Sequence, residues 1–111
     1  MPILPRDGDK ISWTKHVKEK MRFYQLSANR LKRILRHPKR TEKGIAPGTI
    51  AVMQPAGSKK HPIEIWLMYR YLKNKSVRII SAWRYPGISP KGESIPIPED
   101  ILQELQELTK V

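Results

Sequence analysis

Acid–base chemistry in this chain depends on few side chains, because it has no cysteine and only three scattered histidines. His16 is the natural candidate, since the unperturbed pKa of histidine lies near neutrality. It stands in the first turn of an expected helix, where an anion would also meet free backbone N–H groups. Metal-free cleavage of RNA needs such a proton carrier, together with cations that hold the charge of the phosphorane. The alternative is that His16 only packs or hydrogen-bonds at the helix start.

Two arginines could supply those cations. Arg78 and Arg84 lie six residues apart on an expected strand, so strict alternation places them on one face with Ile80 and Ala82. Arginine can hold a phosphate with two parallel hydrogen bonds. If that face also abuts His16, the three side chains form a phosphate clamp and a predicted catalytic centre. The alternative is one ion-paired arginine and one solvated arginine.

Glu64 and Trp83 each have two interpretations. Glu64 is the only acid between Lys43 and Lys91. We expect an internal salt bridge in preference to a general base, because a carboxylate among many cations is stabilised as the anion. Trp83 could stack on an unpaired base, although such an aromatic more often packs in a core.

The charge distribution indicates a polyanionic partner. The chain carries 22 lysines and arginines against 10 acids, a net charge of +12. Most of the cations before residue 44 fall on two expected helices, whereas the tail from Glu93 is acidic. Lysines and arginines that meet phosphates release condensed counterions, which favours RNA or DNA as the partner. The predicted nucleic-acid contacts are Lys15, Lys18, Arg22, Arg33, Arg70 and Trp83.

The expected elements give a single α+β domain. Thr14 and Ser27 can cap helices over about 15–25 and 28–36, and Pro38 stops the second. Runs rich in branched and aromatic residues predict strands over 49–54, 63–72 and 76–85, with a weaker candidate at 40–43. A loose arm or short edge strand precedes them over 1–11. A proline-rich arm then leads to an acidic helix that begins near Pro98, and its buried face would consist of Ile101, Leu102, Leu105 and Leu108.

The length and composition limit the number of domains and the classes of protein that the chain can belong to. A length of 111 residues with 39% hydrophobic content suits one domain over 1–111, with its core over 12–85 and an arm and helix over 86–111. No apolar run approaches the ~20 residues that span a bilayer. The start lacks the layout of a secretion signal. We therefore expect a cytoplasmic protein without metal, other cofactor or membrane association.

Two segments resemble known families. KHVKEKM at 15–21, followed by Leu26-Ser27 and by HPKR at 37–40, is similar to the helix–helix opening of a bacterial domain family of unknown function. VRIISAWR at 77–84 resembles the last-strand signature of that family and of the BrnT toxins. Both groups belong to the RelE/ParE-like class of small toxins. The resemblance covers about 12–85 and implies a toxin-type ribonuclease inhibited by an antitoxin protein.

These observations predict two N-terminal helices packed on a three- to four-stranded antiparallel sheet, followed by a C-terminal helix. The predicted function is a toxin-like, metal-independent endoribonuclease with His16, Arg78 and Arg84 as its reacting centre. One alternative is a non-catalytic nucleic-acid-binding module on the same fold. Another is a protein-interaction domain with a basic face.

Overall fold

A computed structural model describes residues 10–109, except for the side chains of Asn74 and of residues 107–109. The α+β class and the order of two helices, strands and a final helix are confirmed. The elements are β1 (Ile11–Trp13), α1 (Lys15–Tyr24), α2 (Ala28–Arg36), β2 (Arg40–Lys43), β3 (Ile50–Gly57), β4 (Pro62–Tyr71), the 3-10 helix η1 (Lys73–Lys75), β5 (Val77–Pro86) and α3 (Glu99–Thr109).

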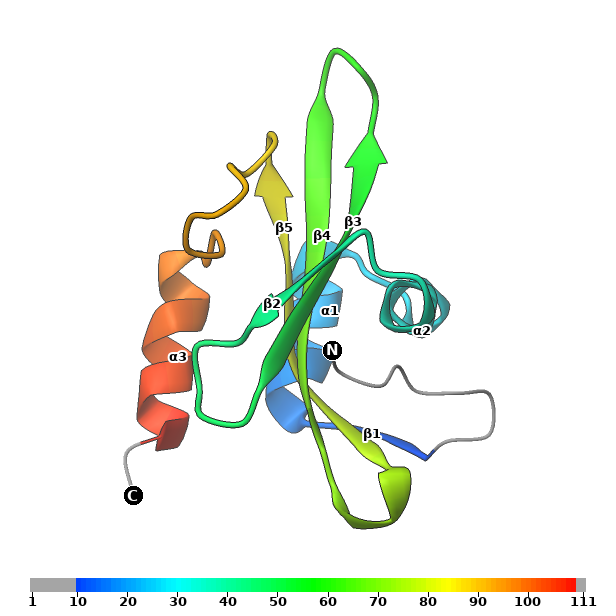
Figure 1. Cartoon of the computed structure of the whole chain (residues 1–111), viewed down its shortest axis with the longest axis vertical. Coiled ribbons are helices and arrows are strands. Elements are labelled where there is room, and N and C mark those ends of the chain that lie inside the picture. The colour runs from blue at the N-terminus through cyan, green and yellow to red at the C-terminus, as the bar shows by residue number, and fades with distance from the viewer. Residues whose placement is uncertain (1–9, 110–111) are drawn as a thin grey trace.

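Within the described residues the strands form one sheet in the order β1-β5-β4-β3-β2 (Figure 1). Its five strands exceed the predicted three to four, and the sheet is mixed because β1 pairs with β5 in parallel. The strand β1 begins at the end of the predicted arm over 1–11, of which residues 1–9 lie outside the described residues. The weak candidate over 40–43 is confirmed as β2, which pairs with β3.

The two early helices begin where their caps predict. Thr14 Oγ1 accepts a hydrogen bond from Val17 N at 3.1 Å, and Ser27 Oγ accepts one from Arg30 N at 3.1 Å. Each bond satisfies one of the backbone donors that a helix start leaves unpaired. Helix α1 ends at Gln25, which adopts the left-handed conformation with φ 56°. The short turn that follows brings α2 back across the sheet.

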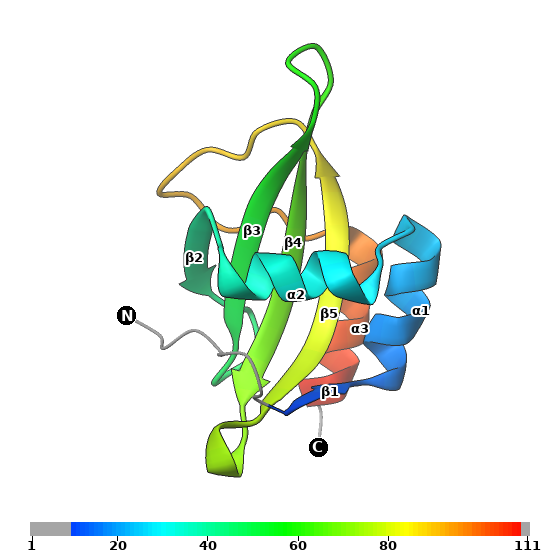
Figure 2. The same ribbon diagram turned by 90° about the vertical axis from the view of Figure 1, so that its right-hand side faces the viewer.

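The sheet separates two apolar cores. On one face, α1 and α2 bury Val17, Leu31 and Ile34 against a cluster that includes Leu67 and Ile79. On the other face, α3 buries Ile101 and Leu105 against Ala51, Met53, Trp66, Met68 and Trp83. Figure 2 shows α2 and α3 on opposite sides of the strands, so the fold has three layers. The predicted burial of Leu108 concerns a side chain outside the described ones.

A bulge in β5 changes which side chains share a face. Met68 pairs with Ser81 and Tyr69 pairs with Ile79, so Ile80 has no residue opposite it. The extra residue reverses the alternation. Arg78 therefore lies on the α3 face, whereas Arg84 lies on the face of α1 and α2. The prediction that strict alternation puts both arginines on one face was wrong.

The bulge coincides with the start of α1. Thr14 N donates to Ile79 O at 3.1 Å, and Thr14 Oγ1 donates to Ile80 O at 3.0 Å. One residue thus bonds two successive carbonyls of β5, which fixes the first turn of α1 against the bulge. No helix among residues 10–109 is long and apolar enough to cross a membrane.

Candidate nucleic-acid interface

Two unpartnered arginines lie side by side on the α3 face of the sheet. Arg70 on β4 pairs directly with Arg78 on β5, and both are exposed. Side chains directly opposite each other on antiparallel strands have Cβ atoms about 5 Å apart, and like charges there are destabilising. Neither guanidinium has a hydrogen bond or ion pair with the described residues. An anion bound between them would relieve this repulsion.

The arginine pair borders a hollow of about 280 Å³, called the arginine hollow below. It is lined by Thr14, Ala46, Pro47, Thr49, Arg70, Arg78, Ile80 and Leu105. The two threonine hydroxyls are held in place, because Thr14 Oγ1 donates to Ile80 O and Thr49 Oγ1 donates to Ala46 O. The walls are therefore fixed by the bulge, by the turn before β3 and by α3.

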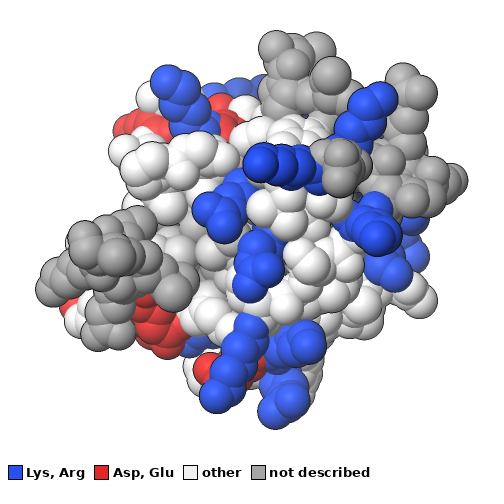
Figure 3. Space-filling view, turned by 90° about the horizontal axis from the view of Figure 1, so that it is seen from below, with Lys and Arg blue, Asp and Glu red and all other residues white. Residues whose placement is uncertain are grey.

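More cations surround this end of the molecule. Lys73 and Lys75 are exposed in η1, the turn between β4 and β5, and Lys15 is exposed next to Thr14. The view from below shows lysine and arginine side chains across the middle of this face, with acidic side chains near its margins (Figure 3). We call this surface, defined by Lys15, Arg70, Lys73, Lys75 and Arg78, the basic end.

His16 is held between two other side chains. Its Nε2 lies 3.0 Å from Ser81 Oγ, and its Nδ1 lies 2.6 Å from Glu104 Oε2. Among the described residues, Glu104 Oε2 has no hydrogen-bond donor of its own. Desolvation by burial lowers the pKa of His16, while the charge of Glu104 opposes the shift. The ring is mainly neutral at physiological pH as a result.

The order Ser81–His16–Glu104 is that of a serine hydrolase triad, but access decides its role. The Ser81 residue is fully buried and the His16 side chain is only 12% exposed. A nucleophile without access cannot meet a substrate. The three residues therefore brace α1 and α3 against β5. The sequence missed Ser81 and Glu104, because only the docking of α3 brings residues 16, 81 and 104 together.

Lys20 strengthens the same contact between α1 and α3. Its Nζ lies 2.7 Å from Asp100 Oδ2 and 3.1 Å from Glu104 Oε1. Burial opposes the charge of Lys20, but the bonds from Asp100 and Glu104 raise its pKa overall. Desolvation likewise opposes the charge of Asp100, yet Lys20 lowers the pKa of that carboxyl. The acidic start of α3 thus neutralises one cation of α1.

Arg84 has a structural partner. Its Nε donates to Tyr24 O at 2.6 Å and a terminal nitrogen donates to Gln25 O at 3.0 Å. These carbonyls end α1, where unpaired acceptors and the helix dipole favour a cation. Six strand residues span about 20 Å, so Arg84 is also far from Arg78. The predicted cluster of His16, Arg78 and Arg84 is not assembled.

Trp83 is not available to a base. It is fully buried, stacks on Trp66 with ring centroids 6.3 Å apart, and donates its Nε1–H to Pro96 O at 2.8 Å. The prediction of a nucleic-acid contact through Trp83 is contradicted by this burial. The alternative expectation, that Trp83 packs in a core, is confirmed.

Glu64 is buried without a direct ion pair to an arginine or lysine among the described residues. It accepts hydrogen bonds from Trp66 Nε1 at 3.1 Å, from Ser89 N at 3.2 Å and from Ser89 Oγ at 2.6 Å. Arg40 donates to the same Ser89 Oγ at 2.7 Å. The expected salt bridge is thus replaced by a serine-bridged network. That network ties the segment after β5 to the sheet.

The remaining predicted contacts divide between two surfaces. Lys15 belongs to the basic end with Arg70. Lys18 and Arg22 border a separate shallow hollow at the end of α1, and Arg33 is exposed on α2. The early helices and the arginine pair therefore do not form one concave basic site around His16.

The described residues contain no group of three histidine or acidic side chains placed to hold a metal ion. Comparison with protein-family models, with characterised proteins and with solved structures finds no match to this chain. The family expected from the sequence therefore stays a prediction.

Proposed function

We propose that the protein binds the phosphodiester backbone of RNA at the basic end, with Arg70 and Arg78 as the central contacts. The observation that carries this proposal is a pair of exposed guanidiniums on adjacent strands beside a hollow, neither of which has a partner among the described residues. Each planar guanidinium can donate two parallel hydrogen bonds to a phosphate. A bound phosphate would also remove the repulsion between the two arginines.

A long polyanion suits the surroundings of the pair better than a single small anion does. Lys15, Lys73 and Lys75 are exposed around it, and the whole chain carries a net charge of +12. Several phosphates bound at once release several counterions, so the affinity of a chain exceeds that of one phosphate.

The proposal does not include cleavage. The imidazole of His16 is engaged by Ser81 and Glu104, and Arg84 caps α1 on the other face of the sheet. A ribonuclease of the toxin type, with an antitoxin partner, would require a reacting centre other than the predicted one. Binding without catalysis needs only the cations that are exposed.

The experiment is a titration of labelled 20-nucleotide single-stranded RNA by fluorescence anisotropy at several salt concentrations. Wild-type affinity should fall steeply with salt, with a slope of about −0.7 per phosphate contacted. The variants Arg70→Ala and Arg78→Ala should each reduce that slope by about 0.7. Lys60→Ala is the matched control, because it removes one exposed charge at the distant β3–β4 turn.

Two further arms separate the alternatives. Arg84→Ala should lower the stability of the fold but leave the salt slope of RNA binding unchanged. Loss of RNA binding in a folded Arg84→Ala variant would instead favour the phosphate clamp predicted from the sequence. Duplex and single-stranded DNA of the same length test whether RNA is preferred. Equal effects of Lys60→Ala and Arg78→Ala would contradict the proposed site, and cleavage of the RNA during the titration would contradict a non-catalytic role.

A further inference from the structure

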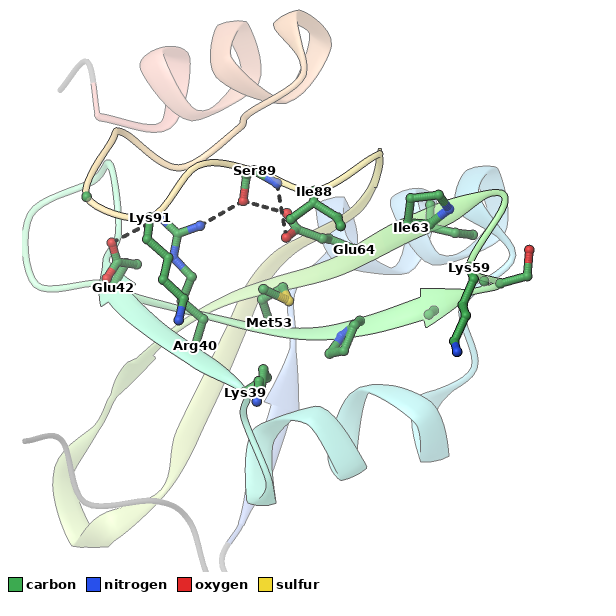
Figure 4. A pocket seen from close by; sticks show the side chains of 16 residues that line it. Lys39, Arg40, Glu42, Met53, Lys59, Ile63, Glu64, Ile88, Ser89 and Lys91 are labelled. Carbon is green, nitrogen blue, oxygen red and sulfur yellow. Dashed lines mark hydrogen bonds and ion pairs between the residues drawn. The ribbon is translucent and has the colours of Figure 1, made fainter.

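A large cleft lies away from the basic end, and we call it the hairpin cleft. It has a volume of about 560 Å³ and opens between the β3–β4 hairpin and the segment that follows β5 (Figure 4). Its lining is Lys39, Arg40, Glu42, Met53, Pro55, Ala56, Gly57, Ser58, Lys59, Pro62, Ile63, Glu64, Ile88, Ser89, Lys91 and Gly92. A volume of this size lies within the range of ligand sites.

One wall of the hairpin cleft is anchored. Glu64 accepts hydrogen bonds from both the backbone N–H and the hydroxyl of Ser89, and Arg40 donates to that hydroxyl (Figure 4). Arg40 also lies over the Trp66 ring, 5.3 Å from its centroid. The segment that carries Ile88 is therefore fixed beside the hairpin, and the cleft is formed without a ligand.

The surface of the hairpin cleft is mostly apolar. Met53 and Pro55 contribute from one face of the hairpin, and Ile88 projects from the opposite wall with 77% of its surface exposed. Ile88 is the most exposed large hydrophobic side chain of the described residues. An exposed apolar surface of this kind with a polar rim is typical of an interaction site.

The rim has unmatched positive charge. Lys39, Lys59 and Lys91 border the hairpin cleft, are exposed and have no partner among the described residues. The two acids of the lining are already engaged, since Glu42 pairs with Arg40 and Glu64 binds Ser89. The occupant best matched to this cleft has an apolar body and carries negative charge.

The shape indicates an extended occupant. Strand β2 pairs with β3 only as far as Met53, so Gln54–Gly57 of β3 has no neighbouring strand on that side among the described residues. From Gln54 to Gly57 this open wall is about 10 Å long. Pro55 lacks an N–H group, which hinders the addition of another strand. Recognition therefore depends on side chains in the cleft and on charges at its rim.

We propose that the hairpin cleft binds an extended acidic segment of a partner protein, with an apolar side chain inserted between Met53, Pro55 and Ile88. Carboxylates before and after that side chain pair with Lys39, Lys59 and Lys91. This site is independent of RNA binding at the basic end, because the two surfaces share no lining residue.

The experiment uses the full chain and three labelled pools of eight-residue peptides. The first pool alternates Asp or Glu with Leu, Ile or Phe, the second replaces the acids by Lys or Arg, and the third replaces the apolar residues by Ser. Anisotropy should show binding of the first pool only. Methyl NMR should show shifts at Met53 and Ile88 and none at Ile80, which borders the arginine hollow.

Variants test the position of the site. Ile88→Asp should weaken binding of the first pool by about tenfold or more, since it removes an apolar contact with the inserted side chain and adds a charge that repels the carboxylates of the peptide. Ile45→Asp is the matched control, because Ile45 is also an exposed isoleucine but lies outside the hairpin cleft. Arg70→Ala with Arg78→Ala should leave peptide binding unchanged while RNA binding falls.

Three outcomes would overturn the proposal. These are an absence of binding by the first pool, equal binding of the first and third pools, and equal weakening by the variants at positions 45 and 88. Shifts of the Met53 and Ile88 methyls on addition of RNA, without any on addition of peptide, would assign the cleft to nucleic acid instead.

Discussion

His16 illustrates, at the scale of single residues, how access separates a catalytic group from a brace. Its neighbours Ser81 and Glu104 are the types that activate a nucleophile, and the Nε2–Oγ distance of 3.0 Å is suitable. Because Ser81 is buried, a substrate cannot reach its hydroxyl. The pKa of His16 is lowered, so the energetic consequence of this arrangement is a dependence of stability on pH.

We expect acid to destabilise the protein through His16. Its folded-state pKa lies below the unfolded value of about 6.5, so the unfolded state binds the proton first as the pH falls. The stability is fully present above about pH 6.5 and declines as the pH falls toward the folded pKa. Urea unfolding at pH 7.5 and at pH 5.5 should show this loss, and His16→Gln should reduce it.

Glutamine is the appropriate replacement because it is neutral and can still hydrogen-bond Ser81. Lys20, Glu104, Asp100 and Glu19 are the charged groups that act on His16, and all remain in the variant. An identical loss of stability in wild type and His16→Gln would show that His16 does not titrate in this range.

At the scale of elements, periodic patterns were sufficient to predict the helices and the longer strands. Thr14 and Ser27 predicted the starts of α1 and α2, and branched residues predicted β3, β4 and β5. The bulge at Ile80 was not predictable, because nothing in the run VRIISAWR distinguishes the extra residue. That single residue separated Arg78 from Arg84. The direct pairing of Arg70 with Arg78 likewise required the register of β4 and β5.

Thr14 should contribute more to stability than an ordinary helix cap. Both Thr14 and Ser27 accept a hydrogen bond from the first turn of a helix, but only Thr14 also donates to the bulge at Ile80 O. Ser27→Ala should cost about 1 kcal/mol, and Thr14→Ala about 1 kcal/mol more, since it leaves a further hydrogen bond unmade. Denaturant midpoints for both variants provide the measurement.

Thr14→Ser is the corresponding control, because serine keeps the hydroxyl that accepts from Val17 N and donates to Ile80 O. It should remain close to wild type in stability. If Thr14→Ala and Ser27→Ala were equally destabilising, the bond to the bulge would have no net effect.

For the whole molecule, the positive charge is spread over more than one surface. The arginine hollow begins at Thr14, two residues before His16, yet the imidazole lies between Ser81 and Glu104. Other exposed cations lie on α1, on α2 and around the hairpin cleft. A compact chain with net charge +12 is destabilised by its own repulsion, which dissolved salt screens.

Sodium chloride should therefore act in opposite directions on folding and on RNA binding. Between about 0.05 and 0.5 M the Debye length shortens from about 14 Å to about 4 Å, so repulsion between surface cations weakens and the melting temperature rises. A gain of about 1 kcal/mol corresponds to about 4–8 °C in a domain of this size. RNA affinity should fall over the same range, because each counterion released into a more concentrated salt solution gains less entropy.

A variant with Lys18, Arg22 and Arg33 replaced by glutamine tests the origin of the effect. All three are exposed on the early helices, and glutamine has a similar helix propensity. This variant should melt higher at low salt and gain less from added salt, while RNA binding at the basic end is largely retained. A melting temperature that falls with salt would instead mean that ion pairs such as Lys20–Asp100 outweigh the repulsion.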